Sequence, residues 1–473
     1  MNLKATALPQ SQEPARLPAG IWKIVSVAAI GSFMSQLDAT IVNVSLPDLV
    51  TTMHAPFSVI QWVVSGYLLA LALTLPLSGW LVGRIGGRAV YVGCFGAFTI
   101  TSGLCALAWS ASSLITFRLL QGMAGGLLAP MAQMMVARAA GSHLPKVASA
   151  VTMPVLLAPL LGPVVAGAIL SVASWRWIFL LNLPFGLLAL VLAVLFLPDD
   201  RAEVRPRSLD MTGLALLAPA LSFLLYGTDH AGQLLGQIVL CGALLLFVAY
   251  FRWAQRKGDS ALIDLRLFHT PAFSAAATTM FLLNGVTFAG QMLLPVWLIH
   301  ACGVSSDRTG LFMLPLGLGM MCTYPLMGHL TDRFGIRRLT SCGALCACVG
   351  SLLLAVLAYT GLNGGILAIA LFLRGAGIGT VGIPAMSAGY ASVARPNIPM
   401  ATTALNIVQR IGGPTITTLC ATFLGWQLPT AAIPHAISGA FTETFGLLCM
   451  FHALLLVATL QLPSALHRKT LSS

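Results

Sequence analysis

Long apolar runs alternate with short polar connections along the whole chain. We find fourteen such runs, at about 22–47, 58–82, 89–110, 113–137, 146–170, 176–197, 211–228, 234–253, 272–299, 309–330, 339–359, 364–392, 400–424 and 441–462. Each run is long enough to cross a bilayer, because about 20 apolar residues in a helix span the hydrocarbon core. Backbone groups in lipid must pair within their own segment, so the runs are expected to be helices. The pattern predicts an all-α membrane protein with fourteen transmembrane helices.

The composition supports lipid as the solvent of this chain. Only 8% of the residues are charged and 58% are hydrophobic, whereas soluble domains carry about 25% charged residues. The ten cysteines lie almost all in apolar runs, where we expect small buried hydrophobic side chains rather than disulfides. The segment before residue 22 lacks the apolar core of a cleavable signal peptide, so the first run is expected to remain in the mature protein.

The basic residues fall almost entirely on one side of the predicted spans. If the N-terminus is cytoplasmic, 20 of the 25 Lys and Arg residues lie in the tails and cytoplasmic loops, and only Arg176 and Arg308 lie in loops on the other side. Cytoplasmic loops of membrane proteins carry this excess of positive charge. The net charge of +12 is therefore interpreted as topology, with both termini cytoplasmic, and no nucleic-acid partner is expected.

Two long charged connections, 198–210 and 254–270, enclose a pair of spans in the middle of the chain. Six predicted spans precede this pair and six follow it. The expected parts are a cytoplasmic N-tail (1–21), a six-helix bundle (22–197), an inserted helix pair with flanking cytoplasmic loops (198–270), a second six-helix bundle (271–462) and a cytoplasmic C-tail (463–473).

A short internal repeat supports two related halves. The loop after the second span of each half reads Gly-x-Leu-x-x-Arg-x-Gly-x-Arg, and the two copies lie 249 residues apart. Parallel repeats build many secondary transporters, whose substrate binds between the halves near mid-membrane. The residues of these loops that we expect to control conformation are Gly79, Arg84 and Arg88 in the first copy, and Gly328, Asp332, Arg333 and Gly335 in the second.

Both loops resemble the pattern Gly-x-Leu-x-Asp-Arg-x-Gly-Arg-Arg of the major facilitator superfamily. The second copy carries the aspartate of the pattern, Asp332, which can face the N-terminus of a neighbouring helix and latch one conformation. The first copy departs from the pattern, because Gly83 stands where the family has the aspartate. The effect of this replacement on the latch of the N-terminal half is left open.

Four further segments resemble motifs of the fourteen-helix drug:proton antiporter branch of this family. They are Leu37–Pro47, Arg118–Gly122, Gly162–Gly167 and Trp175–Gly186. The resemblance covers essentially the full chain and implies the major facilitator fold of two six-helix bundles, here with an inserted helix pair. It ties Gly162, Pro163 and Gly167 to antiport, whereas the spacing of small residues in this segment alone indicates only close helix packing.

Asp38 is the only acidic residue deep within a predicted span. A carboxylate at that depth costs ~2.5–3.5 kcal/mol on insertion scales, so it needs a partner, a proton or water. It is a candidate proton carrier, a candidate site for a cationic substrate, or a structural residue bonded to Asn43 or to a neighbouring hydroxyl. Arg118 is a candidate partner in proton coupling, or its side chain reaches the lipid headgroups. We expect Asp38→Asn to preserve folding, because it removes a costly charge and keeps the shape.

Other polar residues within the spans are candidates for a substrate cavity. They are Asn43, Gln121, Asn182, Arg374 and Arg410. Two arginines in the C-terminal half against one aspartate leave the predicted membrane core with a net positive charge. This excess leaves room for anionic or zwitterionic substrates.

The chain contains neither the HExxH motif nor a nucleotide-binding P-loop. We therefore expect no enzyme activity and no cofactor, with the proton gradient as the energy source.

The leading interpretation is a proton-coupled antiporter that exports small organic molecules such as drugs across a bacterial-type inner membrane. An exporter of a specific anionic or zwitterionic metabolite is one alternative, and a non-transporting membrane sensor or assembly partner is another. The expected partners are a small-molecule substrate and the lipid bilayer, and the need for a periplasmic adaptor is left open.

Overall fold

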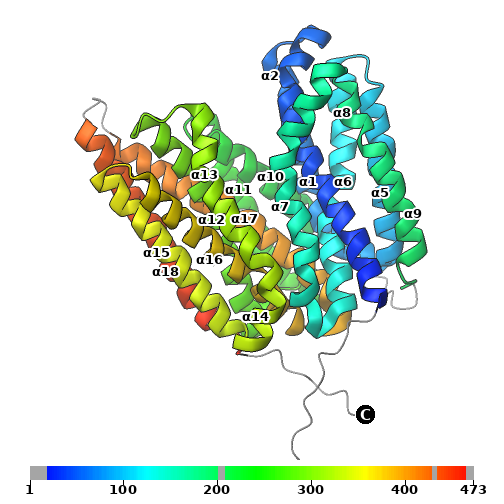
Figure 1. Ribbon diagram of the computed structural model, residues 1–473. Coiled ribbons are helices and arrows are strands. Elements are labelled where there is room, and N and C mark those ends of the chain that lie inside the picture. The colour runs from blue at the N-terminus through cyan, green and yellow to red at the C-terminus, as the bar shows by residue number, and fades with distance from the viewer. Residues whose placement is uncertain (1–18, 201–207, 429–433, 465–473) are drawn as a thin grey trace, which may run out of the picture.

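The computed structural model describes residues 19–200, 208–428 and 434–464, and it is helical throughout this part (Figure 1). The helices of the first group are α1 (Ala19–Met53), α2 (Phe57–Ile60), α3 (Trp62–Thr74), α4 (Ser78–Ile85), α5 (Gly87–Ala106), α6 (Ala111–Ala140), α7 (Leu144–Val172), α8 (Arg176–Leu180) and α9 (Asn182–Phe196). Most of the expected tails 1–21 and 463–473, and residues 201–207 of the expected 198–210 loop, lie outside the described residues.

The remaining helices form a central pair and a second group. The pair is α10 (Met211–Asp229) and α11 (Leu234–Lys257), followed by two short 3-10 turns, η4 (Gly258–Ser260) and η5 (Leu265–His269). The second group is α12 (Pro271–His300), α13 (Ser306–Thr323), α14 (Met327–Phe334), α15 (Ile336–Thr360), α16 (Gly364–Ala391), α17 (Ile398–Gln427) and α18 (Pro434–Leu460).

Each of the fourteen apolar runs coincides with one long helix or with consecutive shorter helices. Among the described residues, twelve helical segments are long and apolar enough to cross a membrane. The helices α7 and α17 are not among these twelve, although both run alongside the others (Figure 1). The all-helical membrane fold is therefore confirmed, whereas the count of fourteen spans remains a prediction.

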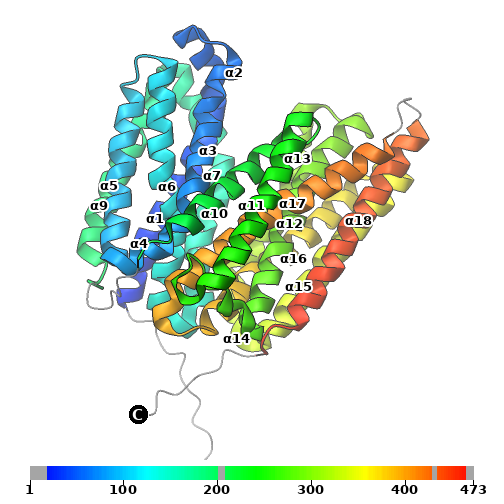
Figure 2. The ribbon, with the colours of Figure 1, turned by 180° about the vertical axis from the view of Figure 1, so that it is seen from behind.

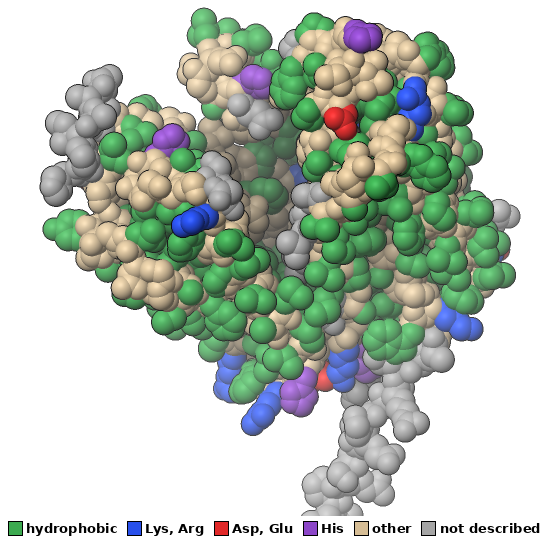
Figure 3. All heavy atoms as spheres, turned by 45° about the horizontal axis from the view of Figure 1, so that its top comes forward, with side chains coloured by type: hydrophobic (Ala, Val, Ile, Leu, Met, Phe, Trp, Pro, Cys, Tyr) green, Lys and Arg blue, Asp and Glu red, His purple; other side chains and the backbone are tan. Residues whose placement is uncertain are grey.

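The long helices gather into two groups that lean apart at one end (Figures 1 and 2). Within the first group α1 packs against α6 and α7; within the second, α12 packs against α17, and α15 packs against α16 and α18. The groups contact each other through α7 with α14 and through α4 and α6 with α17. We call the end that carries α4 and α14 the basic end, because Arg84, Arg88 and Arg333 lie there. Figure 3 shows that the opposite face is hollowed between the two groups.

The central helix pair lies against the outside of both groups. Its first helix, α10, packs against α3 and α17, while α11 packs against α10. Several apolar side chains of α11, among them Leu244, Leu245 and Phe251, are more than half exposed, as expected for a helix that faces lipid.

The repeated loop uses its glycines in the same way in both copies. Gly86 ends α4 with φ 86°, and Gly335 ends α14 with φ 77°. A residue with a Cβ atom is strained in this left-handed region, so glycine is the residue that allows the chain to turn from one helix directly into the next. Each repeat loop therefore turns sharply from one helix into the next at a glycine.

Candidate functional site

A carboxylate lies fully buried in the middle of α1. The neighbouring side chains Leu37, Ile41 and Val42 are buried within the first group of helices, and the periodicity of the helix turns Asp38 inward with them. Asp38 is 0% exposed. Its charge must therefore be compensated by protein groups rather than by water.

The compensating charge comes from α6. Ser110 caps this helix, accepting a hydrogen bond from the backbone N–H of Ser113, and Arg118 follows two turns later. Nη1 of Arg118 lies 2.6 Å from Oδ2 of Asp38, and its Nε donates to the backbone oxygen of Val63 at 3.1 Å. The guanidinium also stacks over the ring of Tyr67 at 4.1 Å. Arg118 is 0% exposed, so the alternative that it reaches the headgroups is wrong.

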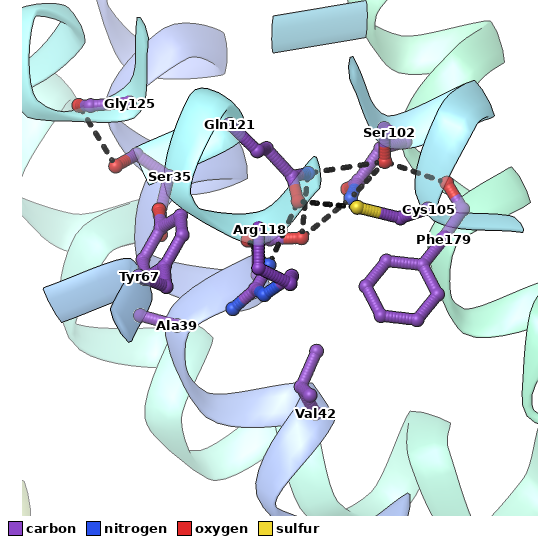
Figure 4. Close-up of polar contacts among 12 residues, drawn as sticks. Ser35, Ala39, Val42, Tyr67, Ser102, Cys105, Arg118, Gln121, Gly125 and Phe179 are labelled. Atoms are coloured by element: carbon purple, nitrogen blue, oxygen red, sulfur yellow. Dashed lines mark hydrogen bonds and ion pairs between the residues drawn. The ribbon is translucent and has the colours of Figure 1, made fainter. Parts of the chain in front are cut away.

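Amide side chains complete the shell of Asp38 (Figure 4). Nδ2 of Asn182, at the start of α9, donates to Oδ1 at 2.7 Å, and Nε2 of Gln121 donates to the same oxygen at 3.2 Å. Both amides also donate to Oγ of Ser102, at 3.0 and 3.1 Å, and this hydroxyl donates to the backbone oxygen of Phe179. Arg118 in turn donates to Oε1 of Gln121 at 2.8 Å. Four helices thus meet in one closed polar network, which we call the Asp38 network.

This geometry corrects two expectations about Asp38. Asp38 is bonded to Arg118, Gln121 and Asn182 and not to Asn43, which is exposed and donates to the backbone oxygen of Ala39 in its own helix. Removing one member of a buried ion pair leaves the other charge uncompensated, which costs about 3–5 kcal/mol. The expectation that Asp38→Asn preserves folding ignored this partner, and we replace it with an expected loss of stability.

The two candidate arginines of the second group lie in different surroundings. Arg374 of α16 is 0% exposed, and its Nη2 donates to the backbone oxygen of Val286 at 2.5 Å. Among the described residues its Nε and Nη1 have no hydrogen-bond partner. Arg410 of α17 is partly exposed. Of the five candidate cavity residues, Gln121, Asn182 and Arg374 are therefore sealed inside their own groups, whereas Asn43 and Arg410 are accessible.

The second repeat loop closes the basic end against α7. A Cβ atom at Gly328 would lie 2.6 Å from Cα of Lys146, so only glycine allows α14 to come this close. Nζ of Lys146 lies 2.6 Å from Oδ2 of Asp332. Lys146 is in the first turn of α7, where an acidic group is also favoured by the helix dipole. The aspartate of this copy thus faces a neighbouring helix N-terminus, as the motif predicts.

The first repeat loop closes the other edge against α17 without an ion pair. Gly79 lies against Thr403, whose Oγ1 would be 2.8 Å from a Cβ atom at position 79. The hydroxyls of Ser78 and Thr403 are 2.8 Å apart and buried. One turn further along α17, Nδ2 of Asn406 donates to Oε1 of Gln133 in α6 at 2.9 Å. Neutral hydrogen bonds therefore hold this edge.

Beside Gly83 lies a small cavity bordered by the connections before and after the central helix pair. This cavity of about 50 Å³ is lined by Gly79, Gly83, Met400 and residues of two connections that include Asp210 and Leu262. Burial alone would raise the pKa of Asp210, but hydrogen bonds from the backbone N–H of Gly213, from Lys257, from Trp253 and from the N–H of Leu262 outweigh burial and lower the pKa. We call this set the Asp210 cluster. It fastens the connection after α11 beside the start of α17.

The arginines of the repeat loops differ in their roles. Nη2 of Arg88 donates to the backbone oxygen of Val194 at 2.6 Å and ties α5 to α9, whereas Arg84 and Arg333 are exposed at the basic end. The carboxylate of Asp200 accepts hydrogen bonds from the first N–H groups of α5 and lies 3.1 Å from Nη1 of Arg138. Asp200 therefore caps a helix where an anion is favoured.

The small residues of α7 pack mainly against α1. Ala158 and Ala166 are 0% exposed, and a Cβ atom at Gly162 would lie 2.5 Å from Oγ1 of Thr40. Gly162 thus brings α7 close to the turn of α1 that carries Asp38. Gly167 is exposed with open space beside it, so it has no part in this packing. The side chain of Pro163 lies outside the described part of the structure.

Sequence reasoning missed the neutral partners. Ser102, Gln133 and Asn406 are uncharged polar residues in apolar runs and lie outside the predicted set of cavity residues. The signal was present, since any polar group at membrane depth needs a partner and is a candidate functional residue. Tyr67 could not be recognised, because its role depends on the arginine that stacks on its ring.

The fold and the site together define a class of protein. A helical membrane protein with two groups of helices, a hollow between them and buried polar groups has the architecture of a transporter. Residues 28–417 match the family model described as Major Facilitator Superfamily. The chain belongs to this family, so it is a transporter and not an enzyme.

Relatives and solved structures agree with this assignment. The chain is 34% identical over 429 residues to the multidrug resistance protein B homolog of Mycobacterium tuberculosis strain ATCC 25618 / H37Rv, covering 88% of this chain and 79% of the relative. It is 32% identical over 344 residues to a Salmonella newport protein provisionally named multidrug resistance protein MdtD, covering 71% and 72%. A crystal structure of a double tryptophan mutant of XylE has the same fold, with a TM-score of 0.64 at 18% identity, covering 95% of this chain and 97% of that one.

Proposed function

We propose that this protein is a proton-coupled antiporter that exports small organic molecules across a bacterial-type inner membrane. The basic end is cytoplasmic in this proposal, both termini are on that side, and α7 and α17 complete fourteen spans. The excess of Lys and Arg in the loops at this end supports the orientation. The names of the two relatives, both multidrug resistance proteins, support export of drug-like compounds.

The Asp38 network is the observation that best supports proton coupling. Asp38 is the carboxylate at membrane depth, and its hydrogen bonds and ion pair to Arg118 fill its shell. Protonation would cancel its charge and release Arg118, which keeps bonds to Val63 and Gln121. These two states of one buried pair favour two different packings of α1 against α6. A ligand or proton that prefers one packing shifts the balance between them.

Reconstituted liposomes provide the test. With a pH gradient imposed, the addition of compounds from a panel of cations, anions and zwitterions is expected to cause proton movement in the direction opposite to the compound for at least one class. Protein-free liposomes and liposomes with the Asp38→Asn variant serve as controls. Compound movement with no proton movement would show that the protein is a transporter without proton coupling.

Cysteine labelling tests the orientation. In a background without the native cysteines, Arg256→Cys at the basic end is expected to react with a membrane-impermeant maleimide only after cells are opened. Ser112→Cys, at the start of α6 on the opposite end, is expected to react in intact cells. Both positions are exposed, and Arg256 is outside the Asp210 cluster, so neither change disturbs a described contact. Labelling of position 256 in intact cells would reverse the orientation.

A further inference from the structure

One face of α17 points toward the first group of helices. Thr403, Asn406 and Arg410 are spaced by three and four residues and therefore share a face. Thr403 contacts Ser78, and Asn406 donates to Gln133, so this face is directed at α4 and α6. Arg410 is one turn further from the basic end on the same face.

The two groups part at Arg410. Exposure along this face rises from 1% at Thr403 to 9% at Asn406 and is greater again at Arg410, which is partly exposed. Arg410 thus lies one turn beyond the Asn406–Gln133 bond, the last hydrogen bond that the described residues of α17 make to the first group.

Among the described residues, no carboxylate balances the charge of Arg410, which makes no hydrogen bond or ion pair there. Asp38 is paired with Arg118. Arg410 is not bonded to any of the other carboxylates whose side chains the structure describes: Asp48, Asp199, Asp200, Asp210, Asp264, Asp332 and Glu443. A guanidinium that is partly withdrawn from water gains most from an anionic ligand, which it can bind through two parallel hydrogen bonds.

A cavity with an uncharged lining lies beside Gln133, the partner of Asn406. Its volume is about 160 Å³, and it is lined by Gln36, Gln133, Thr152 and Met386 together with small and apolar residues, while Arg410 lies outside this lining. Gln133 connects this cavity with Asn406, one turn from Arg410. The amides supply neutral hydrogen-bond donors and acceptors, and the apolar lining accepts a hydrocarbon surface.

We propose that Arg410 binds the anionic group of the substrate, a carboxylate, sulfonate or phosphate attached to an apolar body. This assignment rests on the proposed transport function and names its substrate class. It differs from a pump for lipophilic cations, because a cation at this position would face an unpaired arginine. Asp38 is then reserved for the proton, since its charge is balanced within its own group of helices.

Binding of matched compounds to the purified protein in detergent tests the assignment. The probes are 2-naphthoate, 2-naphthamide and 2-naphthylmethylammonium, with the same three head groups on biphenyl and indole. On at least one scaffold, we expect the carboxylate to bind the wild-type protein about tenfold more tightly than the amide, which is the size of one charge-assisted hydrogen bond. The cation is expected to bind most weakly. Equal binding of carboxylate and amide on all three scaffolds would overturn the assignment.

Variants connect the preference to the residue. Arg410→Gln is expected to remove the preference for the carboxylate, and Arg410→Lys to keep part of it, because Lys retains the charge but not the planar fork. A melting temperature measured for each variant shows whether it is folded. A carboxylate preference that survives in folded Arg410→Gln would also overturn the assignment. Binding in detergent needs no proton gradient, so the two proposals can fail separately. If the wild-type protein prefers the carboxylate but shows no proton-linked transport in liposomes, the proposed antiport is wrong while the anion site at Arg410 is supported.

Discussion

Asp38→Asn is expected to abolish export driven by a proton gradient and to lower the melting temperature of the protein. The carboxylate accepts hydrogen bonds from Arg118, Gln121 and Asn182. Asparagine has one oxygen instead of two and adds an N–H₂ group that faces these donors. The variant therefore cannot titrate, and it leaves the buried Arg118 without a counter-charge, which costs about 3–5 kcal/mol.

A double variant separates the loss of proton-driven export from the loss of stability. The double variant Asp38→Asn with Arg118→Gln removes both charges and is expected to recover most of the lost stability, since neutral hydrogen-bonded groups replace the broken ion pair. It is not expected to recover transport. Melting in detergent and transport in liposomes are the two measurements. Transport by the single variant at the wild-type rate against a gradient would place the coupling elsewhere, with Glu443 and Asp48 as the next carboxylates to change.

Gly328→Leu is expected to reduce transport at least tenfold by preventing closure of the basic end. A side chain at this position meets the backbone of Lys146, which cannot move without moving α7 as a whole. The conformation with the hollow open on the opposite side then becomes unfavourable. Spin-label distances between α7 and α14 are expected to lengthen at the basic end.

Gly317→Leu is the matched control for this change. Gly317 is also a helical glycine of the second group, but it is exposed, and a Cβ atom there meets no other atom within 4 Å. It is expected to transport at close to the wild-type rate. Unchanged distances in Gly328→Leu would show that the glycine does not determine closure.

The fold could be predicted because its signals are local. A run of about 20 apolar residues indicates a membrane helix whatever its neighbours are. The four residues of the network lie in three separate motifs, since Arg118 and Gln121 share one and Asp38 and Asn182 lie in two others. Sequence could not show that all four meet in one network, because Asp38 and Asn182 are 144 residues apart in the chain.

The remaining parts of the site depend on contacts between the halves. Gln133 and Asn406 are 273 residues apart, and neither is charged, so no spacing rule connects them. Asn43 and Asp38 are close in sequence, yet five residues along a helix turn their side chains to different faces. The sequence left open whether Arg118 reaches the lipid headgroups, because its distance from the span end says nothing about the groups that bury it.

The two edges that close the basic end differ in their chemistry. We expect this difference to set the order in which the edges separate. The side chains of the Lys146–Asp332 pair at the α7–α14 edge are 36% and 55% exposed, so dissolved salt screens this pair. The α4–α17 edge is joined by buried hydroxyls and amides that salt hardly affects, and the connection fastened by the Asp210 cluster lies beside it. We therefore expect the α7–α14 edge to separate first, while the α4–α17 edge stays closed and acts as the hinge. The two groups would then rotate about one edge rather than separate evenly, and the ionic strength of the solution at the basic end would set how readily they open.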